Sequence, residues 1–181
     1  MVTVHPTGLA GLVVLEPRVF TDLRGTFVKT FHDSAFRELG LAFAPREEYF
    51  STSHKNVVRG MHFQVPPADH AKLVYCVTGA VLDVVLDLRR NSPTCGGTFA
   101  GELSETNRRS LFIPAGFAHG FLALTDQALM VYKTSTVHDP ACDRGIHWQS
   151  FGFTWPLGGA APILSQRDEA LPPLADFHSP F

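Results

Sequence analysis

The chain is poor in cysteine and carries no excess of charge of either sign. Three cysteines stand far apart among 181 residues, and none belongs to a CxxC pair. Such a set matches neither a disulfide framework nor a thiolate metal site, so we expect reduced, mostly buried thiols. The formal net charge is −2, and charged residues make up 18% of the chain. We therefore expect neither nucleic acid nor a membrane as a partner, and any phosphate needs a local site.

Long hydrophobic runs are also missing. No segment approaches the ~20 apolar residues that a membrane span requires. The N-terminus lacks a basic region, and its apolar stretch is broken by Gly8, Gly11 and Pro17, which argues against a signal peptide. We expect a cytoplasmic protein. The length predicts a single domain spanning residues 1–181.

The sequence does contain a series of apolar runs of strand length, separated by turn residues. Nine are evident: GLVVLEP, GTFVKTF, NVVRGMHF, AKLVYCV, AVLDVVLDL, GTFAGELS, SLFIP, GFLAL and LMVYKTS. This spacing favours an all-β sandwich or barrel. KLVYCV and VLDVVLDL show period-two alternation, and we expect them to form a hairpin across Thr78 and Gly79.

Two short helical patterns flank this strand framework. In DSAFRELGL, Asp33 or Ser34 is expected to cap a helix that turns Phe36 and Leu39 inward. In LSQRDEALPPL, Ser165 is expected to cap a brief helical turn.

Three of the predicted strands place polar side chains on one face, since side chains alternate along a strand. On these faces lie Gly60, His62 and Gln64 of the first strand, Lys72 of the second and Tyr132 of the third. Met61 and Phe63 occupy the opposite face of the first strand. If the polar faces line a barrel, they converge on a pocket with room for one small ligand. Each residue alone is more often structural than catalytic.

Arg59 and His62 lie three positions apart, so alternation places them on opposite faces. Gly60 lies between them, and a glycine bend or bulge there would let both side chains reach the same ligand.

The stretch IPAGFAHGF holds His119 at the entrance of a strand and resembles PxGxxH, the second half of the cupin signature. Cupins commonly bind a metal through an HxH pair, a downstream Glu and this histidine. Here Gln64 stands at the partner position of His62, and no Glu occurs before Gly79. We therefore expect no metal and no other cofactor, and metal-free acid–base chemistry is the stronger use of the cavity.

Five motifs in order, VVRGMHFQ, DVVLDLRRNSPTCGG, LFIPAGFAHGF, VYKTST and LSQRD, resemble the dTDP-4-dehydrorhamnose 3,5-epimerase family. With FTDLRGTF the resemblance covers nearly the whole chain. It implies a cupin-type jelly-roll β-barrel with a few short helices at its periphery. It also implies a homodimer with exchanged N-terminal strands and the epimerisation of a nucleotide-linked 4-keto sugar.

The same resemblance implies roles for individual residues. His62 matches the catalytic base, Asp168 its carboxylate partner, and Tyr132 the general acid. Lys72 matches the lysine near the keto oxygen, and His119 matches a second active-site histidine.

Further positions match residues that bind the substrate. Arg24 and Arg59 match arginines that contact the diphosphate, with Arg24 reaching across the dimer. Gln64, which shares the face of His62, is a further residue that we expect to bind the substrate.

The positions that hold the base and ribose in thymidine-type members are occupied here by Lys29, Glu47 and Tyr49, and all three differ from the family pattern. At the position of Glu47 the thymidine-type members carry a glutamine, which can pair with the imide edge of thymine. A carboxylate, in contrast, only accepts hydrogen bonds. Glu47 therefore suits guanine or, less completely, cytosine. Alternatively, Glu47 is solvated and the base stacks on Phe27 or Tyr49. Sugars linked to dTDP, GDP and CDP all stay open.

The implied chemistry is consistent with these residue types. A hydrogen beside a ketone is weakly acidic, so its removal needs a base in contact and a charge near the oxygen where the enolate develops. His62 is the expected base, oriented by Asp168, and Lys72 would stabilise the enolate. Tyr132 would return a proton from the opposite face.

Two questions stay open at this point. TSTVHDP, after Tyr132, departs from the aromatic residues common in the family, so inversion at C3, C5 or both is undecided. A nucleotide-sugar ketoisomerase, a non-catalytic cupin and a metal-binding cupin are the alternative functions.

Overall fold

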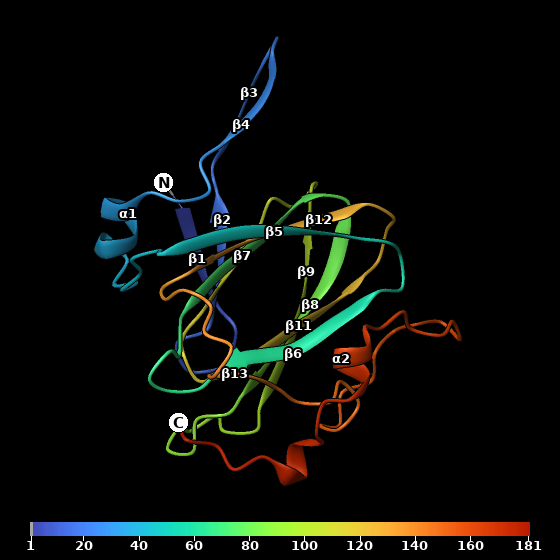
Figure 1. Ribbon diagram of the computed structural model, residues 1–181. Helices are drawn as coiled ribbons and strands as arrows, with labels where there is room; N and C mark the ends of the chain where they lie inside the picture. Colours follow the sequence, from blue (N-terminus) through green and yellow to red (C-terminus); the bar gives the residue numbers. More distant parts are fainter. Residues whose placement is uncertain (1) are drawn as a thin grey trace.

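The computed structural model describes residues 2–181, and strands dominate it (Figure 1). The strands in this range are β1 (Val2–Pro6), β2 (Val13–Pro17), β3 (Val19–Asp22), β4 (Gly25–Val28), β5 (Glu47–Ser53), β6 (Val58–Gln64), β7 (Lys72–Thr78), β8 (Ala80–Asp87), β9 (Thr98–Ser104), β10 (Ser110–Ile113), β11 (Phe117–Ala123), β12 (Ala128–Thr134) and β13 (Asp143–Gly145). The helices are α1 (Asp33–Glu38), α2 (Gln166–Glu169) and the 3-10 helix η1 (Leu174–Asp176). No helix within residues 2–181 has the length and apolar character needed to cross a membrane.

Two antiparallel sheets face each other and form a jelly-roll barrel. One has the order β1-β2-β10-β7-β12-β5, and the other has the order β13-β6-β11-β8-β9. The all-β barrel expected from the sequence is confirmed. Figure 1 shows the helices at the periphery of the two sheets, which agrees with the expected arrangement.

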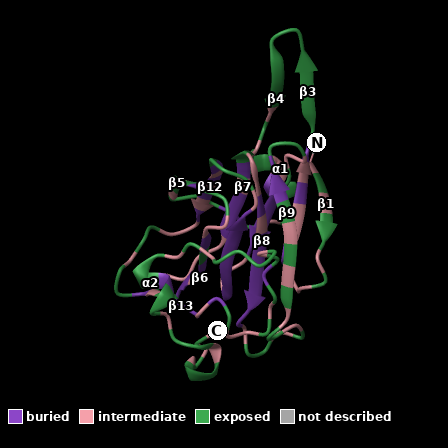
Figure 2. Ribbon diagram, turned by 90° about the vertical axis from the view of Figure 1, so that its right-hand side faces the viewer, coloured by how far each residue is buried: buried purple, intermediate pink, exposed green. Residues whose placement is uncertain are grey.

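The core has three layers because each sheet is covered on both faces. Between the sheets lies an apolar cluster that includes Val74, Val85, Leu111, Phe121 and Met130. Trp148 and Trp155 of the C-terminal part cover the outer face of the five-stranded sheet, where Met61 and Phe63 lie. Phe36 of α1 covers the outer face of the six-stranded sheet. Figure 2 shows the resulting buried strands at the centre of the molecule.

All nine apolar runs overlap a strand, but the hairpin expected across Thr78 and Gly79 is wrong. β7 lies between β10 and β12, whereas β8 lies in the other sheet between β11 and β9. Gly79 has a φ of +72°, and a Cβ there would lie 2.3 Å from Oγ1 of Thr125. The glycine therefore forms a sharp corner that carries the chain from one sheet to the other. Alternation identifies a strand but not its sheet.

The two expected helices form, although one differs in detail. Helix α1 follows His32, whose side chain makes no capping hydrogen bond. Asp33 instead pairs with Arg37 at 2.8 Å, and Leu39 is 40% exposed, so the expected cap and the inward-facing Leu39 are both wrong. At α2 the prediction is confirmed, because Oγ of Ser165 accepts the N–H of Asp168 at 3.1 Å.

The hairpin β3–β4 projects from the barrel as an arm (Figures 1 and 2). The two strands pair with each other and with no other strand in the described part of the chain. Large apolar side chains on the arm are exposed, namely Val19, Phe20, Leu23 and Phe27. The arm carries Arg24, which pairs with Asp22 at 2.6 Å.

The expected irregularity at Gly60 is present. In the β6–β11 pair, His62 lies opposite His119 and Arg59 lies opposite Phe121, with a register shift between these two pairs. Gly60 has a φ of +130°, and a Cβ there would lie 2.5 Å from Cα of Gly120. The shift turns Arg59 and His62 toward the same cavity.

Gly60→Ala should lower the free energy of unfolding by about 3 to 5 kcal/mol, because the added Cβ meets backbone and the backbone angle is unfavourable. Gly152→Ala is the matched control, since Gly152 has a φ of +78° but open space around it. The control should lose only about 1 to 2 kcal/mol. Urea unfolding measures both, and equal losses would contradict the close approach of β6 to β11.

Candidate functional site

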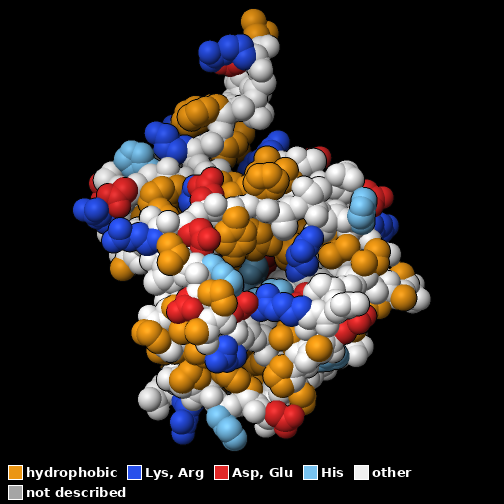
Figure 3. Space-filling view, viewed as in Figure 1, with side chains coloured by type: hydrophobic (Ala, Val, Ile, Leu, Met, Phe, Trp, Pro, Cys, Tyr) orange, Lys and Arg blue, Asp and Glu red, His pale blue; other side chains and the backbone are white. Residues whose placement is uncertain are grey.

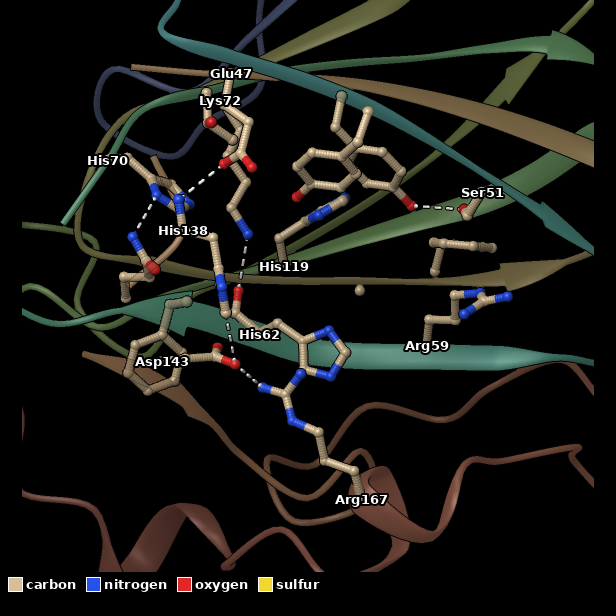
Figure 4. Close-up of a pocket in the computed structure, with 17 residues that line it drawn as sticks. Glu47, Ser51, Arg59, His62, His70, Lys72, His119, His138, Asp143 and Arg167 are labelled. Atoms are coloured by element: carbon tan, nitrogen blue, oxygen red, sulfur yellow. Dashed lines mark hydrogen bonds and ion pairs between the residues drawn. The ribbon is translucent and has the colours of Figure 1, made fainter. Parts of the chain in front are cut away.

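A cavity of about 470 Å³ opens between the two sheets. Figure 3 shows histidine and charged side chains gathered around a hollow on this face. Figure 4 shows the side chains that line it. The ionisable ones are Glu47, Tyr49, Arg59, His62, His70, Lys72, His119, Tyr132, His138, Asp143 and Arg167. The expected convergence of His62, Lys72 and Tyr132 on one pocket is therefore present.

His62 lines the cavity and forms a close pair with the buried Asp168. Nε2 of His62 lies 2.6 Å from Oδ1 of Asp168, and Oδ2 of Asp168 accepts the N–H of Gly60 at 3.3 Å. Burial raises the pKa of the Asp168 carboxyl, but the hydrogen bond and charge of His62, the Gly60 N–H and Arg167 outweigh it and hold this pKa below its usual range. The carboxylate stays ionised and orients the imidazole, leaving Nδ1 of His62 free to act on a ligand.

A second histidine–carboxylate pair lies directly across the strands from the first. His119 is the register partner of His62, and its Nε2 lies 2.9 Å from Oδ2 of buried Asp83. Burial raises the pKa of Asp83, although His119 and Lys72 oppose the shift. The sequence placed His119 in the site but missed Asp83. Asp83 opens the motif DVVLDLRRNSPTCGG, but the motif does not reveal that its side chain contacts His119.

Lys72 reaches the middle of the cavity and is almost fully buried. Its ammonium donates to the backbone oxygen of His62 at 3.1 Å. Burial lowers the pKa of Lys72 to about 8, with Asp143 and Asp83 opposing the shift. The group therefore carries a charge at neutral pH although its side chain is almost fully buried.

Tyr132 lies on the wall opposite His62, because β12 and β6 belong to different sheets. Burial raises the pKa of its phenol, so the hydroxyl stays protonated at neutral pH. Oη of Tyr132 lies 3.4 Å from Oγ of Ser51. An imidazole and a protonated phenol thus face one space from two sides.

One end of the cavity carries a chain of polar contacts that sequence reasoning largely missed. Oε2 of Glu47 accepts the backbone N–H of His138 at 2.8 Å, and Nε2 of His138 lies 3.4 Å from Oδ2 of Asp143. Arg167 completes the chain with a 2.7 Å contact to Asp143. Of these four, only Glu47 was expected. Arg167 could have been identified as a site residue from the sequence, because it lies inside the motif LSQRD.

Arg59 lies at the other end of the cavity, away from Glu47 and His138 (Figure 4). Its guanidinium donates to Oγ of Ser53 at 3.1 Å and to the backbone oxygen of Thr52 at 3.3 Å. These contacts hold the cation at the rim, where it is available to an anion.

Two further polar residues that line the cavity are His70 and Gln64. Burial, aided by the charge of Lys72, lowers the pKa of His70 to about 3, so its imidazole is neutral. The amide of Gln64 donates to the oxygens of Ala68 and Val137 and accepts the N–H of Asp139. Its hydrogen bonds therefore fasten the loops beside the cavity.

Three expected substrate residues do not line this cavity. Arg24 and Phe27 lie on the arm, and Lys29 follows it directly. Phe27 is 60% exposed and packs only loosely against Phe20, with ring centroids 6.2 Å apart. Within one chain these residues are separate from His62, so their role across a dimer stays a prediction.

Within residues 2–181, no three or more histidine, cysteine or acidic side chains are grouped in a way that could hold a metal ion. Cys76 and Cys142 are buried and Cys95 is exposed, and all three are free.

The sequence profile of the dTDP-4-dehydrorhamnose 3,5-epimerase family matches residues 6–176. The chain belongs to this family. The resemblance carried by the five motifs is confirmed, and so is the cupin-type fold. As a member of the dTDP-4-dehydrorhamnose 3,5-epimerase family, the protein is an isomerase that acts on a nucleotide sugar.

Individual members of the dTDP-4-dehydrorhamnose 3,5-epimerase family cover nearly the whole chain. The dTDP-4-dehydrorhamnose 3,5-epimerase of Escherichia coli K12 is 44% identical over 168 residues, which are 91% of this chain and 90% of that one. The dTDP-4-dehydrorhamnose 3-epimerase of Streptomyces niveus is 38% identical over 91% of this chain and 80% of its own length. The dTDP-6-deoxy-D-glucose-3,5-epimerase of Legionella pneumophila, solved in complex with dTDP-4-keto-L-rhamnose, superposes with a TM-score of 0.94 at 34% identity, covering 98% of this chain and 95% of that one.

Ser165→Ala should loosen α2 and with it the contact between Asp168 and His62. Loss of the cap costs about 1 kcal/mol locally. A loss of this size changes the ratio of docked to undocked α2 by about fivefold. We therefore expect the epimerase turnover number to fall by up to about fivefold. Ser34→Ala is the matched control, because Ser34 lies at the start of α1 but does not cap it. Steady-state kinetics check both, and equal activities would contradict the importance of the cap.

Proposed function

We propose that the protein inverts one or both carbons beside the ketone of a nucleoside-diphosphate 4-keto-6-deoxy sugar, with the dTDP-linked sugar as the first candidate. One observation carries this proposal. His62, paired with Asp168, and Tyr132 lie on opposite walls of one cavity, with Lys72 reaching its middle. Removal of a proton from one face of a sugar ring and its return to the other face requires this arrangement.

The first step is deprotonation beside the ketone. Nε2 of His62 is engaged by Asp168 at 2.6 Å, so Nδ1 is the nitrogen that takes the proton. The ionised Asp168 stabilises the imidazolium that forms. As the carbon loses its proton, negative charge moves to the keto oxygen. The ammonium of Lys72 stabilises that charge in a cavity where water screens it little.

The second step is reprotonation. The enolate carbon takes the proton of the Tyr132 hydroxyl from the opposite wall, which inverts the centre. Carbon is then neutral and the phenol has become a phenolate, while His62 holds the proton removed first. His62 then releases its proton to solvent, and the Tyr132 phenolate takes one up. This restores the starting state, so the reaction uses no oxidant and no second substrate.

Binding of the diphosphate is assigned to Arg59. A guanidinium matches the geometry of phosphate oxygens, and Arg59 lies at the cavity rim away from Glu47. The anionic diphosphate is thereby kept away from Glu47 and Asp143, which favours one orientation of the substrate.

The nucleotide is proposed from the names of the relatives, which are dTDP-sugar epimerases. A GDP-linked sugar is the second candidate from the sequence, because Glu47 offers only acceptor atoms. The geometry gives it less support: Oε2 of Glu47 already accepts the N–H of His138, and Glu47 lies at the end of the cavity away from Arg59. Since the diphosphate joins the base to the sugar, a diphosphate at Arg59 with the sugar beside His62 directs the base away from Glu47, which favours the dTDP-linked sugar.

A homodimer is part of the proposal. The exposed apolar side chains of the arm, including Phe20 and Leu23, leave it without a covering surface in one chain. Exchange of arms between two chains would cover them and bring Arg24 to the partner's cavity.

Incubation with dTDP-, GDP- and CDP-linked 4-keto-6-deoxyglucose in D₂O, followed by NMR, tests the chemistry and the nucleotide together. We expect deuterium at C3, C5 or both, with inversion at the labelled carbon. His62→Ala should abolish exchange, and Tyr132→Phe should keep exchange while inversion falls by about 10² to 10⁴. Migration of the keto group, or strong exchange in His62→Ala, would contradict the proposal.

The pH dependence of kcat/KM tests the role of Lys72, because this ratio reports the ionisation of the free enzyme. With a pKa lowered to about 8, Lys72 is charged below that pH and neutral above it. The value of kcat/KM should therefore fall as pH rises through about 8. Lys72→Met should lose about 10² to 10³ in turnover. Lys72→Arg, which stays charged, should retain more activity and move the fall to higher pH. An unchanged alkaline limb in Lys72→Met would argue against this role.

A further inference from the structure

We propose that Tyr49 is a positioning residue for Tyr132, an inference that rests on the proposed function of Tyr132 as proton donor. The two aromatic rings stack nearly parallel, with centroids 4.9 Å apart and planes inclined by 14°. Sequence comparison alone suggested a different role for Tyr49, as a residue that contacts the nucleobase. The geometry points instead to a role in holding the general acid.

The stack follows from the register of the two strands. β5 and β12 run antiparallel, and Tyr49 is the direct partner of Tyr132. Side chains at directly paired positions point to the same face of a sheet, which here faces the cavity. β5 is the edge strand of its sheet. Tyr49 is accordingly 43% exposed, whereas Tyr132 is only 7% exposed. The outer ring therefore separates the inner ring from solvent.

Hydrogen bonding alone does not fix the Tyr132 hydroxyl. Among residues 2–181 its one hydrogen-bond partner is Oγ of Ser51, at 3.4 Å. Hydroxyl hydrogen bonds are usually about 2.7 to 2.8 Å long, so this contact is weak. The ring of His119 touches Tyr132 only edge-on, with centroids 6.1 Å apart. The stacked face of Tyr49 is thus the closest aromatic constraint on the orientation of the acid.

The consequence is specific to one half of the reaction. If the ring of Tyr49 is removed, Tyr132 can turn toward the space that opens beside it, and its hydroxyl leaves the position facing the sugar. His62 lies on the other sheet and is held by Asp168, so deprotonation continues. Exchange of the hydrogen beside the ketone should then persist while inversion slows. A residue that merely bound the nucleobase would instead change KM.

The test compares Tyr49→Leu with Tyr49→Phe in D₂O, using the sugar nucleotide that the unaltered enzyme turns over best. Tyr49→Phe keeps the ring and should keep the turnover number for inversion within about twofold. Tyr49→Leu should lose about tenfold in that number, the upper range expected for one aromatic pair. Deuterium incorporation into unreacted substrate should stay close to that of the unaltered enzyme, and KM should change little. Thermal unfolding of both variants verifies that they are folded.

Three results would overturn the inference: a raised KM with an unchanged turnover number in Tyr49→Leu, an equal fall in exchange and inversion, or an equal loss in Tyr49→Phe. These results concern variants only. Failure of the unaltered enzyme to invert any of the sugar nucleotides would instead contradict the proposed function, so the two failures are distinguishable.

Discussion

The close approach of β6 to β11 at Gly60 and Gly120 is the constraint on which the site depends. A Cβ at Gly60 would lie 2.5 Å from Cα of Gly120, and one at Gly120 would lie 2.6 Å from the backbone oxygen of Arg59. Only two glycines facing each other allow the strands to meet here. The register shift that accompanies them places His62 opposite His119 and turns Arg59 to the same cavity.

The jelly roll explains why the two walls of the cavity are built independently, each by its own sheet. His62 and His119 come from the five-stranded sheet, whereas Lys72 and Tyr132 come from the six-stranded sheet. Each sheet is packed on its outer face by its own apolar cluster. Because the interior of a protein is close-packed, the distance between the walls is set by the core and not by the side chains of the site. A substitution at either end of the cavity should therefore leave the distance between its walls unchanged.

Much of the fold was readable from the sequence because apolar runs and alternation report burial directly. The prediction failed where burial is not the signal. β5 is an edge strand with a mostly exposed, polar sequence, so no apolar run marks it. The pairing of β7 with β8 was wrong because alternation does not reveal which sheet a strand joins. In the site, the residues that match a known role within a motif were found. Asp83 and Arg167 were missed although they lie inside motifs, and His138 and Asp143 lie outside them. The importance of all four lies in contacts with residues distant in sequence.

The pair formed by His62 and Asp168 has one further consequence. The two residues are separated by 106 positions, and Asp168 belongs to a four-residue helix held by the Ser165 cap and the contact between Arg167 and Asp143. This helix lies outside both sheets, so it can detach at a lower free energy than the barrel can unfold. Docking of the last part of the chain thus completes the pair, and under the proposed mechanism a barrel formed before that docking lacks the carboxylate that orients His62.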